Sequence, residues 1–195
     1  MITMTKKLEN LMRELKKTNS ETFYHCIRTK RYTNKMIDLM NGAGVTQYSQ
    51  EETDIICMGA MLHDMGKLNV RNFVLTKDGS LTEEEKENIK KHPGFGWEML
   101  KDEIPESEQA IIRDICLYHH ERIDGSGYEG KTDIPLYVQL VSVCDVFDAL
   151  HSDRIYRRGY SVEKSLGMIK DRACGGFSET VVGFLEQVVR ALENE

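Results

Sequence analysis

Hydrophobic positions recur every three or four residues along most of the chain, and this spacing predicts helices. The first stripe lies in residues 4–17, where one face of a charged helix gathers Leu8, Leu11, Met12 and Leu15. We interpret this segment as a packing helix, and a dimerisation or docking helix is the alternative.

The same pattern continues through the rest of the chain. It predicts further helices over 20–40, 51–65, from 82 onward, 93–100, 107–120 and 136–150, and two that begin at Ser161 and Ser178. Thr82 and Glu85 have the spacing of a capping box. Residues 69–80 and the glycine-rich 121–134 lack the period and are predicted loops.

These elements predict an all-α fold, a compact bundle of eight or nine helices. No repeat or domain boundary is evident, so residues 1–195 are expected to form one domain. Within it we expect an N-terminal helix in 1–19, a chemical core in 20–160 and C-terminal helices in 161–195.

Composition narrows the class of protein. The content of 40% hydrophobic and 30% charged residues suits a globular domain. No apolar run approaches the ~18 residues that a membrane span requires. Residues 1–17 show no apolar signal-peptide core, so the sequence predicts a cytoplasmic protein without membrane contact.

Charge and cysteine usage exclude further classes. The net charge of -6 argues against binding to duplex nucleic acid. The five cysteines are widely spaced, odd in number and without a CxxC pair, which indicates neither a disulfide framework nor a zinc ribbon. We expect buried or idle thiols.

Candidate chemistry is concentrated in the histidines. Four of the six lie in three short stretches, as the pair His63-Asp64, the single His92 before Pro93, and the pair His119-His120. Imidazole and carboxylate are common ligands of zinc, iron and manganese. The grouping therefore predicts a site with more than one metal ion.

Helix geometry restricts how the paired residues can act. Adjacent residues on a helix point about 100° apart. His63 and Asp64 can therefore serve one site only near a helix end, or with the carboxylate bridging two ions. Gly66 suits a helix end there, and the same argument applies to His119 and His120.

The remaining candidates each have a plainer alternative. Asp145 lies in an apolar helix, where a metal or an ion pair with Arg154 would offset its burial. His92 alone would read as a neighbour of a helix N-cap, and Asp148 as a hydrogen-bonding or capping group. Glu21 and His25 share one helix face, and the alternative for this pair is a surface contact. We interpret His151 as a surface histidine.

Together the stretches HDMGK, HHERIDGSGY and DVFDAL with the arginines that follow resemble the HD-GYP branch of the HD-domain metal-dependent phosphohydrolases. The resemblance runs from about Ser20 to Gly159. It implies hydrolysis of a cyclic dinucleotide, chiefly cyclic di-GMP, by two or three divalent ions. Iron and manganese are the expected metals, with zinc, nickel or magnesium as alternatives.

The resemblance also implies a role for individual residues. The first metal would be held by His25, His63, Asp64 and Asp145. Asp64 would bridge to a second metal, held by His92, His119 and His120, and Glu21 occupies the position of a third-metal ligand. Asp64 and Lys67 would act in catalysis, and the substrate would contact Lys67, Tyr128, Arg154 and Arg157.

One position departs from the family pattern. Glu129 stands where the GYP motif has proline, which we expect to add flexibility and negative charge to the loop. Three hypotheses follow: a cyclic dinucleotide phosphodiesterase, a phosphohydrolase of another nucleotide or phosphoester, or a non-catalytic sensor of nucleotide or metal. A signalling protein contacting residues 121–134 and a homodimer are further expectations.

Overall fold

The computed structural model describes residues 5–75, 77, 79–153 and 158–193. Within these residues it contains ten α-helices, one 3-10 helix and no strand, so the all-α prediction is confirmed. Nine of the α-helices have seven residues or more. In chain order the elements are α1 (Lys6–Thr18), α2 (Ser20–Gly42), α3 (Gln50–Leu62), η1 (Met65–Asn69), α4 (Asn72–Leu75), α5 (Glu83–Ile89), α6 (His92–Leu100), α7 (Glu106–Tyr118), α8 (Leu136–His151), α9 (Val162–Lys170) and α10 (Glu179–Glu193).

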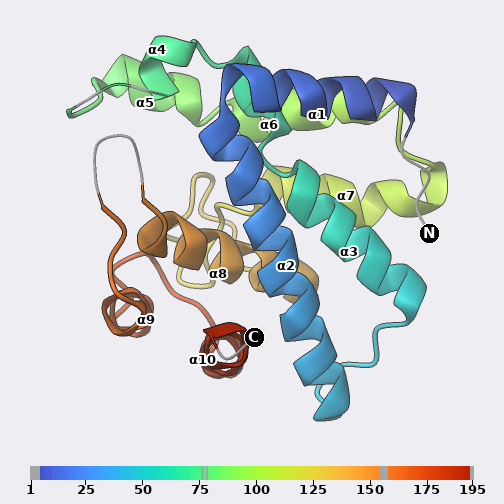
Figure 1. Ribbon diagram of the computed structural model, residues 1–195, viewed down its shortest axis with the longest axis vertical. Coiled ribbons are helices and arrows are strands. Elements are labelled where there is room, and N and C mark those ends of the chain that lie inside the picture. The colour runs from blue at the N-terminus through green and yellow to red at the C-terminus, as the bar shows by residue number, and fades with distance from the viewer. Residues whose placement is uncertain (1–4, 76, 78, 154–157, 194–195) are drawn as a thin grey trace.

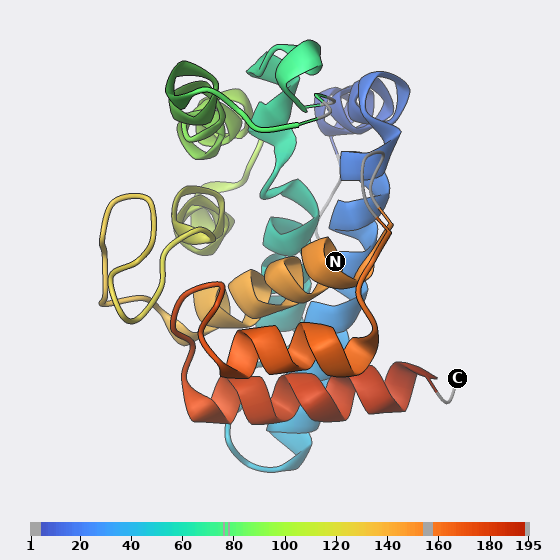
Figure 2. The ribbon, with the colours of Figure 1, turned by 90° about the vertical axis from the view of Figure 1, so that its left-hand side faces the viewer.

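The long helix α2 runs along most of the length of the molecule (Figure 1). Helix α3 runs beside it and α8 crosses it, and both pack against α2. Helices α9 and α10 lie together beyond α8, whereas α1, α5 and α6 lie at the opposite end (Figure 2). The middle of the molecule is therefore the place where α2, α3, α7 and α8 come together.

Two hydrophobic clusters hold this arrangement. The larger joins α2, α8 and the C-terminal helices through Phe147 and its neighbours. The smaller joins α1, α3, α6 and α7 around Leu62 and Leu100. Helix α1 buries Leu8, Met12 and Leu15 in that second cluster, which favours the packing interpretation of its stripe.

The helix predicted over 51–65 is shorter than expected. It ends at Leu62, His63 caps it, and a 3-10 helix follows from Met65. The expectation of a helix end near His63 and Asp64 is therefore confirmed, but Gly66 lies inside the 3-10 helix and does not mark that end. Because the α-helix ends here, regular helical spacing does not fix the directions of the His63 and Asp64 side chains.

Several helix boundaries follow the sequence signals. The Thr82–Glu85 capping box and the Ser161 cap are both formed. Helix α2 begins at Ser20 as predicted, and Asn19 is its N-cap, because the Asn19 side chain accepts the Thr22 amide. The segment 69–80, predicted to be irregular, contains the short helix α4. Among the described residues, no helix combines the length and hydropathy needed to cross a membrane.

Candidate metal centre

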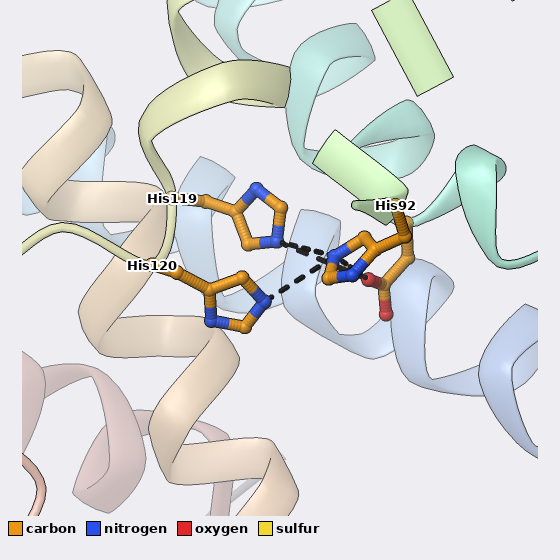
Figure 3. A group of neighbouring side chains, drawn as sticks. His92, His119 and His120 are labelled. Carbon is orange, nitrogen blue, oxygen red and sulfur yellow. Dashed lines mark hydrogen bonds and ion pairs between the residues drawn. The ribbon is translucent and has the colours of Figure 1, made fainter. Parts of the chain in front are cut away.

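Five elements bring seven of the eight predicted metal ligands to the middle of the molecule. One group consists of Asp64, His92, His119 and His120, and a second of His25, His63 and Asp145. Within each group the ligand atoms lie within 4.8 Å of one another. Six of the seven residues are buried and His120 is half-buried. Figure 3 shows His92, His119 and His120 turned toward one another.

Helix ends place these side chains. His63 caps α3, His119 caps α7, and His92 is the first residue of α6 with Pro93 behind it. His25 and Asp145 instead project from the interiors of α2 and α8, which cross at this point. His25 and His63 are 38 positions apart in the chain, and His63 and Asp145 are 82 apart, yet all three side chains meet in one buried space.

Three of the histidine rings are held in the same way. The Nδ1 atoms of His63 and His92 each lie 2.7 Å from a backbone carbonyl, that of Ala60 and of Ile89. His119 Nδ1 lies 3.0 Å from the carbonyl of Cys116. Each Nδ1–H therefore donates outward, so Nε2 is the ring nitrogen that faces the cluster. Metal-binding histidines are commonly held in this way.

Within the described part of the chain, some inward-facing nitrogens face one another and one makes no hydrogen bond, although His92 Nε2 also lies 3.2 Å from Asp64 Oδ1. His92 Nε2 lies 3.2 Å from His119 Nε2 and 3.3 Å from His120 Nε2, so nitrogen faces nitrogen. His63 Nε2 is buried and makes no hydrogen bond there. Buried polar atoms are rarely left without a partner. The donor set therefore fits divalent cations.

The charges differ between the two groups. Burial opposes protonation of His63, but the neighbouring Asp64 and Asp145 carboxylates outweigh it and raise its pKa to about 10. Burial and the other imidazoles instead hold the pKa values of His119 and His120 well below the usual range. Opposed charges thus surround His63, whereas His119 and His120 present neutral nitrogen donors.

Two predicted catalytic or substrate residues border the cluster. Lys67 Nζ lies 2.6 Å from Asp64 Oδ2. Burial opposes this charge pair, but Lys67 holds the pKa of Asp64 well below its ordinary value. The Tyr128 ring stacks on His120 with centroids 4.2 Å apart, and 38% of the residue is exposed.

The other predicted contacts lie elsewhere. Glu21, on α2, lines an outer cavity of about 680 Å³ with Tyr24, Arg28 and His151, and belongs to neither ligand group. The third-metal role of Glu21 stays a prediction. Arg154 and Arg157 lie outside the described residues. His151 is half-buried, stacks on Phe147 and contacts the Tyr160 carbonyl through Nδ1.

Two residues of the site were not anticipated from the sequence. Glu121 is 2% exposed and accepts the backbone N–H groups of Glu129 and Lys131, at 2.9 and 2.8 Å. Arg122 is also buried and donates to the carbonyls of His119 and Cys174. A charged pair directly after the two histidines was the available signal.

The Glu121 contacts bear on the expectation for Glu129. An N–H at position 129 binds a buried carboxylate, whereas proline at this position would have no N–H to donate. Glutamate therefore allows the 121–134 loop an anchor that proline would remove. This backbone contact was not anticipated, and the flexibility and negative charge expected of Glu129 stay predictions.

Comparison with known proteins places this geometry in context. A sequence profile described as "HD domain" matches residues 25–176. The chain is 37% identical over 183 residues to the cyclic di-GMP phosphodiesterase response regulator RpfG of Xanthomonas campestris, covering 86% of this chain and 47% of that protein. It is 31% identical to a 3'3'-cGAMP-specific phosphodiesterase of Vibrio cholerae, covering 80% of this chain and 29% of that one.

A solved structure agrees in fold. An HDG"Y"P protein of Bdellovibrio bacteriovorus superposes with a TM-score of 0.67 at 22% identity, covering 86% of this chain and 52% of that chain. The chain spans less than half the length of the two curated relatives.

Proposed function

The chain belongs to the HD-domain family, and we propose that it is a metal-dependent phosphodiesterase that opens a cyclic dinucleotide, with cyclic di-GMP as the first candidate. The observation that carries the proposal is the buried convergence of five imidazoles and two carboxylates. The resemblance to the HD-GYP branch supports it, as do relatives named as cyclic di-GMP phosphodiesterases.

The two ligand groups would each hold one ion. His25, His63 and Asp145 would form one position, and His92, His119 and His120 the other, with Asp64 between them. Iron or manganese is the proposed metal, because imidazole with carboxylate suits both. Divalent ions held this way polarise phosphoryl oxygens and lower the pKa of nearby water. A third ion near Glu21 is part of the proposal.

Lys67 is the proposed catalytic cation. Its side chain is partly exposed and its ammonium group donates to one oxygen of Asp64, so Lys67 lies at the border between the cluster and solvent. A short rotation would direct it to a phosphate oxygen that approaches the cluster. Positive charge placed there stabilises the charge that develops on a transferring phosphoryl group.

Tyr128 is the proposed contact for a nucleotide. Its exposed ring stacks on His120, and Glu121 holds the loop that carries it. Aromatic faces bind bases by stacking, at about 1–3 kcal/mol per base in single-strand complexes. Arg154 and Arg157 complete the proposed phosphate contacts.

The test is a comparison of substrates on metal-loaded protein. Protein purified without oxygen and loaded with Mn²⁺ or Fe²⁺ is incubated with cyclic di-GMP, cyclic GMP-AMP and bis(p-nitrophenyl) phosphate. The proposal expects a linear dinucleotide, with cyclic di-GMP cleaved at the highest kcat/KM. Cleavage of the generic ester alone would replace it with the broader phosphohydrolase function.

The sensor alternative predicts a different result. A non-catalytic protein would bind the cyclic dinucleotide and release it intact. The convergence of seven metal donors, six of them buried, favours catalysis, because a protein that only binds a nucleotide has no need of them. A signalling partner at residues 121–134 and a homodimer remain proposals, which crosslinking and light scattering address.

A further inference from the structure

Nδ1 contacts are described for four of the cluster histidines, and one of the four is held differently from the other three. His63, His92 and His119 present Nδ1 to backbone carbonyls, which are neutral. His25 Nδ1 instead lies 2.6 Å from Oδ2 of Asp148, a carboxylate. Its Nε2 lies 2.8 Å from Asp145 Oδ1, on the side of the ligand cluster.

Asp148 is itself firmly held. It is fully buried on α8, three residues beyond Asp145. Arg28 donates to both of its oxygens, from Nε at 2.6 Å and from Nη2 at 3.0 Å, and Ser152 Oγ donates at 3.1 Å. With His25, four donors fix the orientation of one carboxylate.

We propose that Asp148, oriented and charge-balanced by Arg28, is the positioning residue that makes His25 a metal ligand. The inference rests on the proposed metal-dependent function. Asp148 fixes the proton of His25 on Nδ1, so that Nε2 is the nitrogen that can bind a metal ion. A carboxylate partner also makes imidazole a stronger donor than a carbonyl does.

The contacts of Asp148 indicate that it does not bind a metal ion directly. Both Asp148 oxygens are occupied by Arg28, Ser152 and His25, and Asp148 belongs to neither ligand group. Asp148 therefore acts through His25. The effect of losing it should fall on the position formed by His25, His63 and Asp145 rather than on that formed by the other histidines.

Arg28 connects this arrangement to the surface. Its side chain is 38% exposed and lines the outer cavity beside Glu21 and Tyr24. The two-donor contact with Asp148 needs the planar guanidinium, which lysine does not reproduce. Arg28→Lys should therefore loosen Asp148 without opening the core.

The test compares Asp148→Asn with Asp114→Asn in Mn²⁺ titrations of the metal-free protein. Asp114 is a partly buried carboxylate of α7 that accepts the Tyr137 hydroxyl, outside the ligand groups. We expect Asp148→Asn to weaken one Mn²⁺ position by roughly 10- to 100-fold, the usual effect of losing such a partner. Asp114→Asn should bind as the unaltered protein does.

A second readout is specific to His25. In Zn²⁺-loaded protein with ¹⁵N-labelled histidine, Asp148→Asn should shift the His25 ring resonances most and leave those of His92 near their original values. A general loss of structure would instead move all of them. If Asp148→Asn does not fold, Arg28→Lys decides, with a smaller loss of Mn²⁺ affinity at unchanged melting temperature.

The outcomes are distinguishable. Equal Mn²⁺ affinity in Asp148→Asn and the unaltered protein, or in Arg28→Lys where only that variant folds, would overturn the inference and leave the proposed function intact. Failure of the unaltered protein to bind Mn²⁺, Fe²⁺ or Zn²⁺ would overturn both.

Discussion

Gly66→Ala should disrupt the metal centre from outside the ligand set. A Cβ at Gly66 would lie 1.9 Å from the carbonyl oxygen of His92 and 2.4 Å from the amide nitrogen of Gly96. Ordinary contact begins near 3.4 Å, so η1 and α6 would have to separate by roughly 1.5 Å. Both clashing atoms belong to the backbone, and no side-chain rotation relieves them.

The expected loss of activity and stability follows from the displacement of His92 and α6. His92 Nε2 lies 3.2 Å from Asp64 Oδ1, and its backbone would move with α6. A shift of about 1 Å in a catalytic group can reduce a rate by about 10²-fold. Overpacking of this kind costs about 1–3 kcal/mol of folding stability. For a chain of this length each kcal/mol lowers the melting temperature by about 2–4 °C.

The assay measures metal per chain by mass spectrometry, the melting temperature and the turnover of cyclic di-GMP. Gly94→Ala is the matched control, because Gly94 lies on α6, the helix that Gly66→Ala would displace, with no atom within 4 Å of the added Cβ. We expect Gly66→Ala to lose metal and activity and Gly94→Ala to retain both. Normal metal content and melting temperature in Gly66→Ala would refute the close-contact argument.

Four further predictions follow from the site. Asp64→Ala should remove most bound metal and abolish hydrolysis, and full metal content with normal turnover would contradict a bridging role. Glu21→Ala should lower the metal content by about one ion per chain if a third position exists, whereas unchanged stoichiometry would return Glu21 to a surface role. Because the pKa of His63 is raised to about 10, its proton must leave on metal binding, so Mn²⁺ affinity should rise from pH 6 to pH 8 by about tenfold per pH unit for each proton released; a flat profile would contradict this. Glu129→Pro should raise KM for cyclic di-GMP more than KM for bis(p-nitrophenyl) phosphate. It should also lower the free energy of unfolding by about 1–3 kcal/mol, because Glu121 loses a hydrogen-bond donor. Glu129→Ala keeps the N–H and should leave the free energy of unfolding unchanged.

Much of the candidate metal centre was predictable because its signals are local. Adjacent ligands cannot share one face of a regular helix, and the structure accordingly places His63 and Asp64 where α3 ends and His119 at the cap of α7. Capping boxes are also local, and the one at Thr82 formed as expected. Periodicity was sufficient for the all-α fold, since the main helices each carry a buried stripe.

The supporting contacts were not predictable because they join distant segments. Asp148 and His25 are 123 positions apart, and their pairing depends on how α2 crosses α8. The role of Glu121 depends on the path of the 121–134 loop, which has no periodic pattern. A sequence shows which residues are chemically capable, but the partners of a buried charge are set by packing.

The most direct test of the account is a crystal structure of Mn²⁺-loaded protein, with anomalous diffraction data to locate the metal. The account predicts two anomalous peaks about 3.5–4 Å apart, the usual spacing in two-metal sites, with Asp64 between them. His25, His63 and Asp145 should surround one peak, and His92, His119 and His120 the other. No peak among these side chains, in crystals with Mn²⁺ bound elsewhere on the protein, would contradict it.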